Sequence, residues 1–339
     1  SLFSNTIGQK NSAFGSQALF ANTTGITNSA FGTYALNANT IGQSNTAIGH
    51  QSLLNNTTGS NNTAVGNNSL NANTIGISNT AVGHQSLLNN TTGASNVAVG
   101  VNALLANTVG IYNTAVGQQA LSSNTTGGKN TAVGLQSLYT NAVGSNNTAF
   151  GYAALFSNTT NSNSAFGYKA LTANTTGAFN VAVGYISLQS NTRGSYNTAV
   201  GYNSLSANTF GNYNSAFGYK ALNSNTTGNR NSAFGYSSLR LNTIGVRNTA
   251  FGYASMLFNT TGSYNVAFGT MALYVNTIGA ANTAVGFESL YNNTTSNNSA
   301  FGYRALKANT IGTNNTAVGA DVLYNNTIGT NNTAVGINS

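Results

Sequence analysis

A five-residue motif returns at a fixed spacing along the whole chain, and it constrains the fold more than any other feature. The motif is Asn-(Thr/Ser/Val)-Ala-(Val/Phe/Ile)-Gly, and its Asn stands at 20 places from Asn11 to Asn332. Every step between copies is 17 residues, except for two steps of 16. A fixed period of this kind is typical of solenoids, whose units bury their apolar faces only against neighbouring units. Positions within the repeat are numbered 1 to 17 from this Asn.

Glycine divides each unit into short segments. Of the 39 glycines, 20 stand at position 5, 18 stand at position 15, and the last is Gly128. Glycine placed so regularly indicates positive φ or close backbone approach, and hence corners. The segments between corners are too short for helices, and the chain has no Pro to interrupt a strand ladder. We therefore predict an all-β fold: a repetitive β-solenoid or β-roll of about 20 coils with a 17-residue period, covering 1–339 as one continuous array.

Several positions form columns of constant size. Position 3 is Ala in all 20 copies, and position 9 is Leu in every copy except Met256. At positions 2 and 4, which share one face of a strand, all six Ser at position 2 accompany a Phe at position 4. Such compensation is typical of close packing, so we predict that this face is the interior. The Ala face would then lie against a second copy of the chain. The alternative is a lone solenoid whose outer Ala is kept small by the corners.

Asn occupies positions 1 and 12 in every copy. Stacked Asn side chains can hydrogen-bond along a ladder, so we expect these columns to be structural. Some of them, such as Asn22-Thr23-Thr24, match the acceptor pattern for N-glycosylation. In a sequence made largely of Asn and Thr, composition alone produces that match.

Composition and charge argue against several classes of function. Only 12 of 339 residues are Asp, Glu, Lys or Arg, far below the ~25% usual in soluble proteins. The net charge is +8, but the ten cations are scattered over the chain, whereas nucleic-acid binding needs a dense basic stripe. Cys is absent, and no run of ~18 apolar residues would span a membrane.

Ionisable side chains do not gather in the sequence. The two acids, Glu288 and Asp321, fall in different coils, and His50 and His84 share position 6 but lie two coils apart. Catalysis and metal binding both need such groups at one point. We therefore expect no enzyme activity, no metal and no cofactor.

Aromatic residues mark one column in the second half of the chain. Position 6 is Tyr in seven consecutive coils: Tyr152, Tyr168, Tyr185, Tyr202, Tyr219, Tyr236 and Tyr253. In a stack of coils these residues would form an aromatic ladder. The ladder would either stabilise the surface by stacking or form a strip that binds carbohydrate or a partner.

The repeat also resembles known fibre proteins. Units such as Asn62-Thr63-Ala64-Val65-Gly66, followed by Ser69-Leu70 and Asn73-Thr74-Ile75-Gly76, resemble the repeats of bacterial and phage tail-fibre-like proteins. They are similar, more distantly, to the head repeats of trimeric autotransporter adhesins. The resemblance implies an extracellular, trimeric, β-rich shaft at a cell or virion surface.

Two functions follow as hypotheses. The first is a non-catalytic structural subunit or shaft of an extracellular fibre or adhesin, which associates with copies of itself as a trimer or end to end. The alternative is an ice-binding β-solenoid, because Thr-rich columns at a constant rise could match a lattice. That function needs Thr-x-Thr ranks on one strand face, whereas the Thr residues at positions 13 and 14 are adjacent and point to opposite faces.

Overall fold

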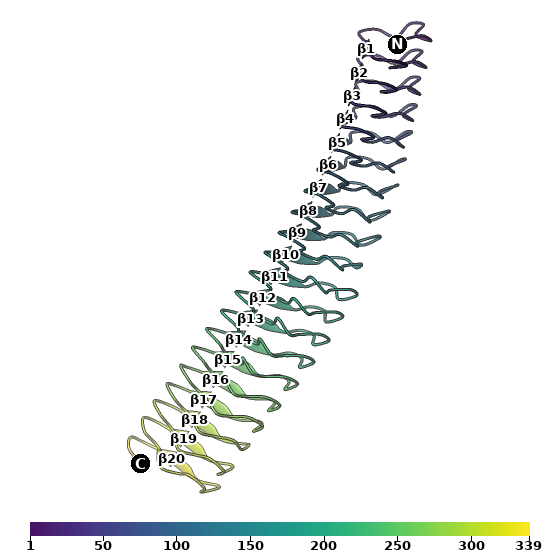
Figure 1. Ribbon diagram of the computed structural model, residues 1–339. Coiled ribbons are helices and arrows are strands. Elements are labelled where there is room, and N and C mark those ends of the chain that lie inside the picture. Colours follow the sequence, from purple (N-terminus) through teal and green to yellow (C-terminus); the bar gives the residue numbers. More distant parts are fainter. The chain divides into compact units, whose positions relative to one another are not determined.

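The computed structural model describes all 339 residues, and it contains strands and turns but no helix. The chain divides into two compact units, 1–166 and 167–339. Each unit is a β-solenoid whose coils follow the 17-residue period, and each coil contributes one parallel strand of three residues at positions 2 to 4 (Figure 1). The all-β solenoid predicted from the repeat is confirmed.

The strands of the first unit are β1 (Ser12–Phe14), β2 (Ser29–Phe31), β3 (Thr46–Ile48), β4 (Thr63–Val65), β5 (Thr80–Val82), β6 (Val97–Val99), β7 (Thr114–Val116), β8 (Thr131–Val133), β9 (Thr148–Phe150) and β10 (Ser164–Phe166). Those of the second unit are β11 (Val181–Val183), β12 (Thr198–Val200), β13 (Ser215–Phe217), β14 (Ser232–Phe234), β15 (Thr249–Phe251), β16 (Val266–Phe268), β17 (Thr283–Val285), β18 (Ser299–Phe301), β19 (Thr316–Val318) and β20 (Thr333–Val335).

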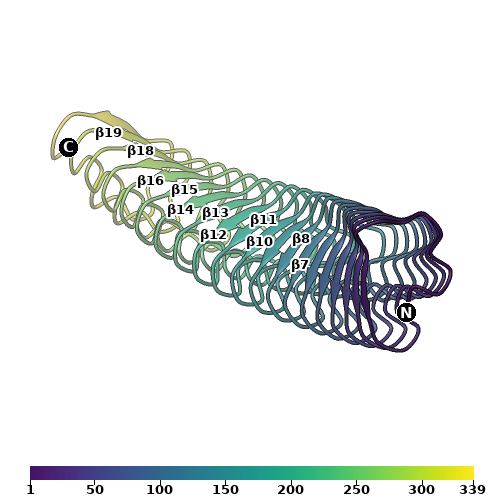
Figure 2. The same ribbon diagram turned by 90° about the horizontal axis from the view of Figure 1, so that it is seen from above.

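Identical positions of the repeat stack on one another. In the pairing of β13 with β14, for example, Ala216 lies opposite Ala233 and Phe217 opposite Phe234. Seen from above, the strands of successive coils lie over one another on the same side of the coil (Figure 2). Hydrogen bonds between coils continue beyond the strands: the N–H of Leu104 donates to the C=O of Ala120 at 3.0 Å. The ladder therefore runs around the coil and not only along its short strands.

The interior consists of small, apolar and amide side chains. The Ala at position 3 and the Leu at position 9 are fully buried in nearly every coil, and so are the Asn at positions 1 and 12. The prediction that positions 2 and 4 face the interior was wrong. Position 4 is one-third to one-half exposed in most coils, as at Val116 (36%) and Phe31 (44%). A coil of 17 residues is narrow, so the Ala and Leu columns leave no room in the interior for the side chains at positions 2 and 4, which point outward.

The Asn columns form the predicted ladders. The Nδ2 of Asn56 donates to the Oδ1 of Asn39 in the preceding coil at 2.9 Å, and also to the C=O of Gly59 at 2.9 Å. The Nδ2 of Asn45 donates to the same Gly59 carbonyl at 2.8 Å. Except at the Oδ1 of Asn276, the buried amides of these columns thus have protein partners in place of water. Asn22 is fully buried in this ladder, so the folded chain cannot present it for glycosylation.

Corners arise from both glycine and other residues. The glycines at position 5 have φ near +130°, as at Gly117 (131°), a conformation that only Gly adopts readily. Those at position 15 are required by close approach, because a Cβ at Gly110 would collide with the side chain of Asn107. Three further positions per coil, 7, 9 and 17, adopt left-handed φ without Gly, as at Leu121 (52°). The sequence did not reveal these corners, because position 9 is Leu, which rarely adopts this conformation, and positions 7 and 17 vary in residue type.

The finding that position 3 faces inward and position 4 outward can be tested by placing Leu at each of these two adjacent positions. Ala115→Leu should destabilise the fold by about 1–3 kcal/mol or more, because the buried Ala column has no space for added methyl groups. Val116→Leu, on the exposed face, should change the unfolding free energy by under about 0.5 kcal/mol. Chemical denaturation followed by far-UV circular dichroism measures both. Equal tolerance of the two variants would contradict the inward assignment of position 3.

Candidate functional site

The tyrosines at position 6 form a stacked ladder in the second unit. Ring centroids from Tyr168 to Tyr253 lie 4.8–5.4 Å apart, with interplanar angles of 6–11°. These six rings are 37–50% exposed. Tyr152, the seventh residue of the predicted ladder, belongs to the first unit and is 40% exposed.

The stacking determines what this ladder can contact. Each inner ring has both faces covered by its neighbours, so its edge and hydroxyl are what it offers to solvent. Stacking of a sugar on an aromatic ring needs an open face, and in the ladder that face is occupied. Hydroxyl groups at a regular spacing can still exchange hydrogen bonds with a polar ligand. The ammonium of Lys220, 5.1 Å from the centroid of Tyr219, adds positive charge beside the column.

A second aromatic column lies at position 17 of the same unit. Phe179 stacks on Tyr196, and Tyr196 stacks on Tyr213, both with centroids 5.0 Å apart. The next two coils carry Arg230, whose guanidinium lies 5.8 Å from the Tyr213 ring, and Arg247, which packs on the ring of the following coil. This column was not predicted from the sequence, although its residues recur at the same 17-residue spacing.

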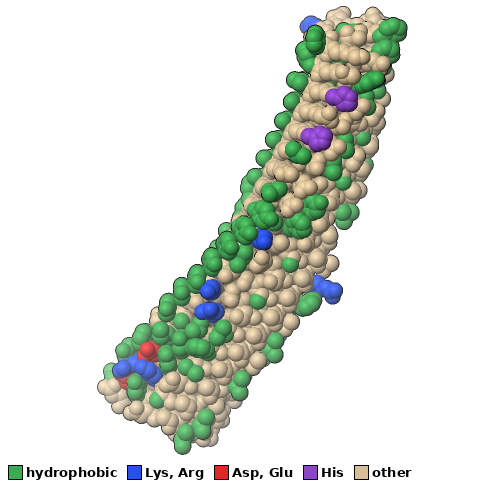
Figure 3. Space-filling view, in the orientation of Figure 1, with side chains coloured by type: hydrophobic (Ala, Val, Ile, Leu, Met, Phe, Trp, Pro, Cys, Tyr) green, Lys and Arg blue, Asp and Glu red, His purple; other side chains and the backbone are tan.

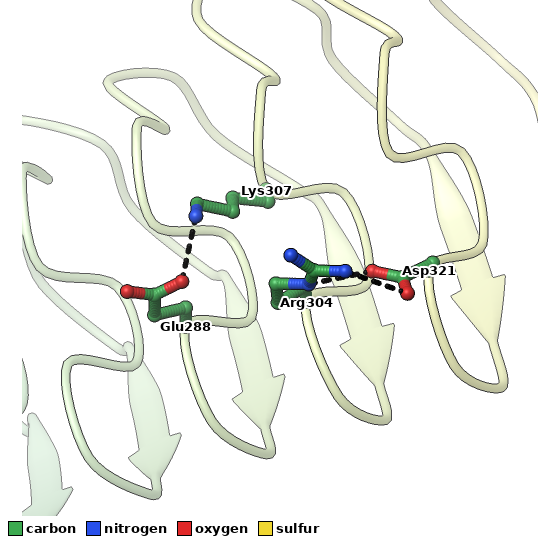
Figure 4. A network of polar contacts seen from close by, with 4 residues as sticks. All are labelled: Glu288, Arg304, Lys307 and Asp321. Atoms are coloured by element: carbon green, nitrogen blue, oxygen red, sulfur yellow. Dashed lines mark hydrogen bonds and ion pairs between the residues drawn. The ribbon is translucent and has the colours of Figure 1, made fainter.

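Both acidic residues of the chain are paired with cations near its C-terminal end, as Figure 4 shows. The Nζ of Lys307 lies 2.7 Å from Glu288. Arg304 donates two hydrogen bonds to Asp321, from Nε at 2.8 Å and from Nη2 at 2.9 Å. Each pair joins adjacent coils. Each carboxylate is therefore engaged in an ion pair with a basic side chain and is not a free general base.

The pKa values of the two basic side chains in these pairs are both raised. The hydrogen bond to Glu288 raises the pKa of Lys307, and the hydrogen bond to Asp321 raises the pKa of Arg304. Partial burial raises the pKa of the nearby Tyr291 phenol. These shifts keep the cations charged, which is the direction expected for a stabilising contact and opposite to the direction that would make Lys307 a base.

Other ionisable groups remain apart. His50 and His84 are exposed at position 6, two coils from each other. No group of three His, Cys, Asp or Glu side chains is placed to hold a metal ion. A cavity of about 580 Å³ lies at the last coil, beside Arg304 and Asp321 and reaching the chain end at Ser339. The Arg304 and Asp321 head groups in its wall are engaged with each other.

Comparison with models of protein families and with curated proteins finds no match for this chain. The structure also has no helix that is long and apolar enough to cross a membrane.

The Glu288–Lys307 pair predicts a specific dependence on pH. Because the folded state raises the pKa of Lys307, the pair stabilises the fold below the ordinary lysine pKa of 10.5 and loses its effect as pH rises through the higher, folded value. Glu288→Gln should therefore lower the unfolding free energy at pH 8 by under about 1 kcal/mol. The difference from the parent chain should shrink above pH 10.5. Gln85→Asn, at the same position of another coil, is the control and should show no such pH dependence. A difference that persists at high pH would contradict the assignment.

Proposed function

We propose that this chain is a non-catalytic structural element, a shaft segment of an extracellular fibre or adhesin at a cell or virion surface. The observation that carries the proposal is the ladder itself. Each coil repeats the hydrogen bonds and buried columns of the one before it, as the Asn39–Asn56 contact illustrates. Such a stack suits a rigid extended support, because stability accumulates from one coil to the next.

The distribution of chemistry supports the same proposal. The exposed surface is built from Asn, Thr, Ser, aliphatic and aromatic residues, and the ionisable side chains are few and either dispersed or paired. In this proposal the Tyr168–Tyr253 ladder strengthens the shaft by stacking between successive coils. Its hydroxyl edges offer hydrogen bonds to surface carbohydrate, without stacking of sugars on ring faces.

The proposal includes association of copies of the chain, which can be tested by measuring the mass of the particles in solution. At micromolar concentration we expect the purified chain to form assemblies that are multiples of 34.6 kDa. Three copies is the number that the resemblance to trimeric fibre repeats implies. Mass photometry and sedimentation velocity measure the species directly. A stable monomer would refute the associating shaft.

An ice-binding function is the second candidate, and one observation favours it. On the outward face of β3 to β5, Thr46, Thr63 and Thr80 stand in a column beside an aliphatic column. A regular Thr and aliphatic array at the strand spacing of ~4.8 Å could order water. Phe replaces the aliphatic residue in nine of the 20 coils, which breaks the flat array, so the shaft is the better-supported function.

Thermal hysteresis separates the two candidates. For a structural shaft we expect no gap between the melting and freezing temperatures of a solution of the chain. A gap that grows with protein concentration, and that disappears in the variant Thr46→Lys, Thr63→Asp, Thr80→Lys, would establish ice binding. The same substitutions at the exposed position 14, Ile41→Lys, Thr58→Asp and Ile75→Lys, provide the control.

A further inference from the structure

The outward face of the strands, positions 2 and 4, is exposed, and its position 4 column stays apolar along the repeat. Position 4 is Phe, Val or Ile in all 20 coils, and most of these side chains are between 36% and 48% exposed. Rows of hydrophobic side chains are visible on the surface in Figure 3. Exposed apolar patches of this extent are typical of interaction sites.

Charge avoids this face, although other exposed positions accept it. All 12 charged residues of the chain stand at positions 7, 10, 14 or 17 of the repeat, and none stands at position 2 or 4. Arg193, for example, occupies position 14, a column whose other members include the half-exposed Ile75 and Val109. If exposure to water were the only constraint, charged residues would be expected at positions 2 and 4 as well as at positions 7, 10, 14 and 17.

The sizes of the two outward columns are also matched. Each of the six Ser at position 2 accompanies a Phe, and nine of the 11 Thr accompany Val or Ile. Both side chains point to the same outward face, so the matching keeps the volume of this face nearly constant from coil to coil. Solvent imposes no such limit, whereas a close-packed contact does.

We infer that the outward strand face is the surface through which copies of this chain pack against one another. The inference rests on the association in the proposed function and identifies where it takes place. A second copy is the occupant that fits, because it presents the same coil spacing. It can therefore continue one packing pattern over many coils, whereas a partner without this repeat would meet the face at only a few.

The area of the face is sufficient for a stable contact. A Phe side chain buries about 150–250 Å² in full, so the 39% exposed at Phe150 and at Phe166 amounts to roughly 60–100 Å² for each of these coils. Ten coils with the smaller Val among them supply roughly 500–800 Å² from position 4, and position 2 adds to it. A standard interface buries about 800 Å² on each partner.

The test places charge on this face and compares it with the more exposed column at position 14, which already contains a charged residue, Arg193. The face variant is Val82→Lys, Val99→Asp, Val116→Lys, in which the alternating signs allow neighbouring coils to pair. The control is Thr92→Lys, Val109→Asp, Thr126→Lys, at position 14 of the same coils. We expect the face variant to remain a folded monomer at concentrations at least about a hundredfold above those at which the control assembles, because charges would be buried in the contact.

Mass photometry gives the assembly, and far-UV circular dichroism shows that each variant is folded. If the charged face variant does not fold, Val82→Thr, Val99→Thr, Val116→Thr keeps the strand shape and should still weaken assembly relative to the parent chain. A parent chain that is itself monomeric would refute the associating shaft and this inference together. A parent chain that assembles, with a face variant that assembles equally well, would overturn the inference and leave the shaft proposal standing. Loss of assembly in the control, with the face variant unaffected, would place the contact on the position 14 column instead.

Discussion

Hydrogen bonding between successive coils at a single strand spacing is the constraint on which the rest of this structure depends. Because each coil takes its register from the next, as Ala216 does from Ala233, every inward side chain must pack against a copy of itself. Columns of Ala and Leu meet this condition, since equal volumes stack without gaps. The same constraint explains how three non-glycine residues per coil, such as Leu121, hold left-handed φ. Their N–H groups donate to an adjacent coil, which offsets a conformational cost of about 1–2 kcal/mol each.

The polar part of the interior depends on the same stacking. Most Asn side chains at position 12 bond both to the preceding Asn and to the glycine carbonyl of their own coil, as Asn309 does with Asn293 and Gly312. The second of the two shortened coils interrupts the ladder, whereas in the first Asn158 still donates to Asn141 Oδ1 at 3.2 Å. Thr295 replaces the glycine, its carbonyl accepts from Asn293, and Asn276 Oδ1 in the preceding coil is left buried without a partner. The ladder resumes one coil later, so the defect stays local, as nearest-neighbour stability allows.

The period, the strands, the glycine corners and the Asn ladders could all be predicted from the sequence, because each leaves one residue type in one column. The direction of the strand could not. Alternation shows that positions 2 and 4 share a face. Whether that face lies inside depends on the width of the coil, and the residues at any one position do not indicate that width.

The Tyr168–Tyr253 column could be predicted because it is unbroken, whereas Arg230 interrupts the second aromatic column. The Glu288–Lys307 pair was missed because it joins positions 7 and 10, whose adjacency only the folded coil reveals.

The scarcity of charge follows from the stacking as well. Any residue that recurs at one position lies about 4.8 Å from its copies, and like charges directly opposite one another on neighbouring strands are destabilising. A charged column is therefore excluded, and charge enters singly or as a pair of opposite sign. Arg230 and Arg247 are an exception, because these two like charges occupy the same column in adjacent coils. Arg230 packs on Tyr213 in the preceding coil and Arg247 on Tyr264 in the following one, so the two guanidinium groups turn away from each other. An exterior restricted in this way must obtain its contacts from hydroxyl, amide, aliphatic and aromatic groups, because a repeated surface can present these groups in every coil without repulsion.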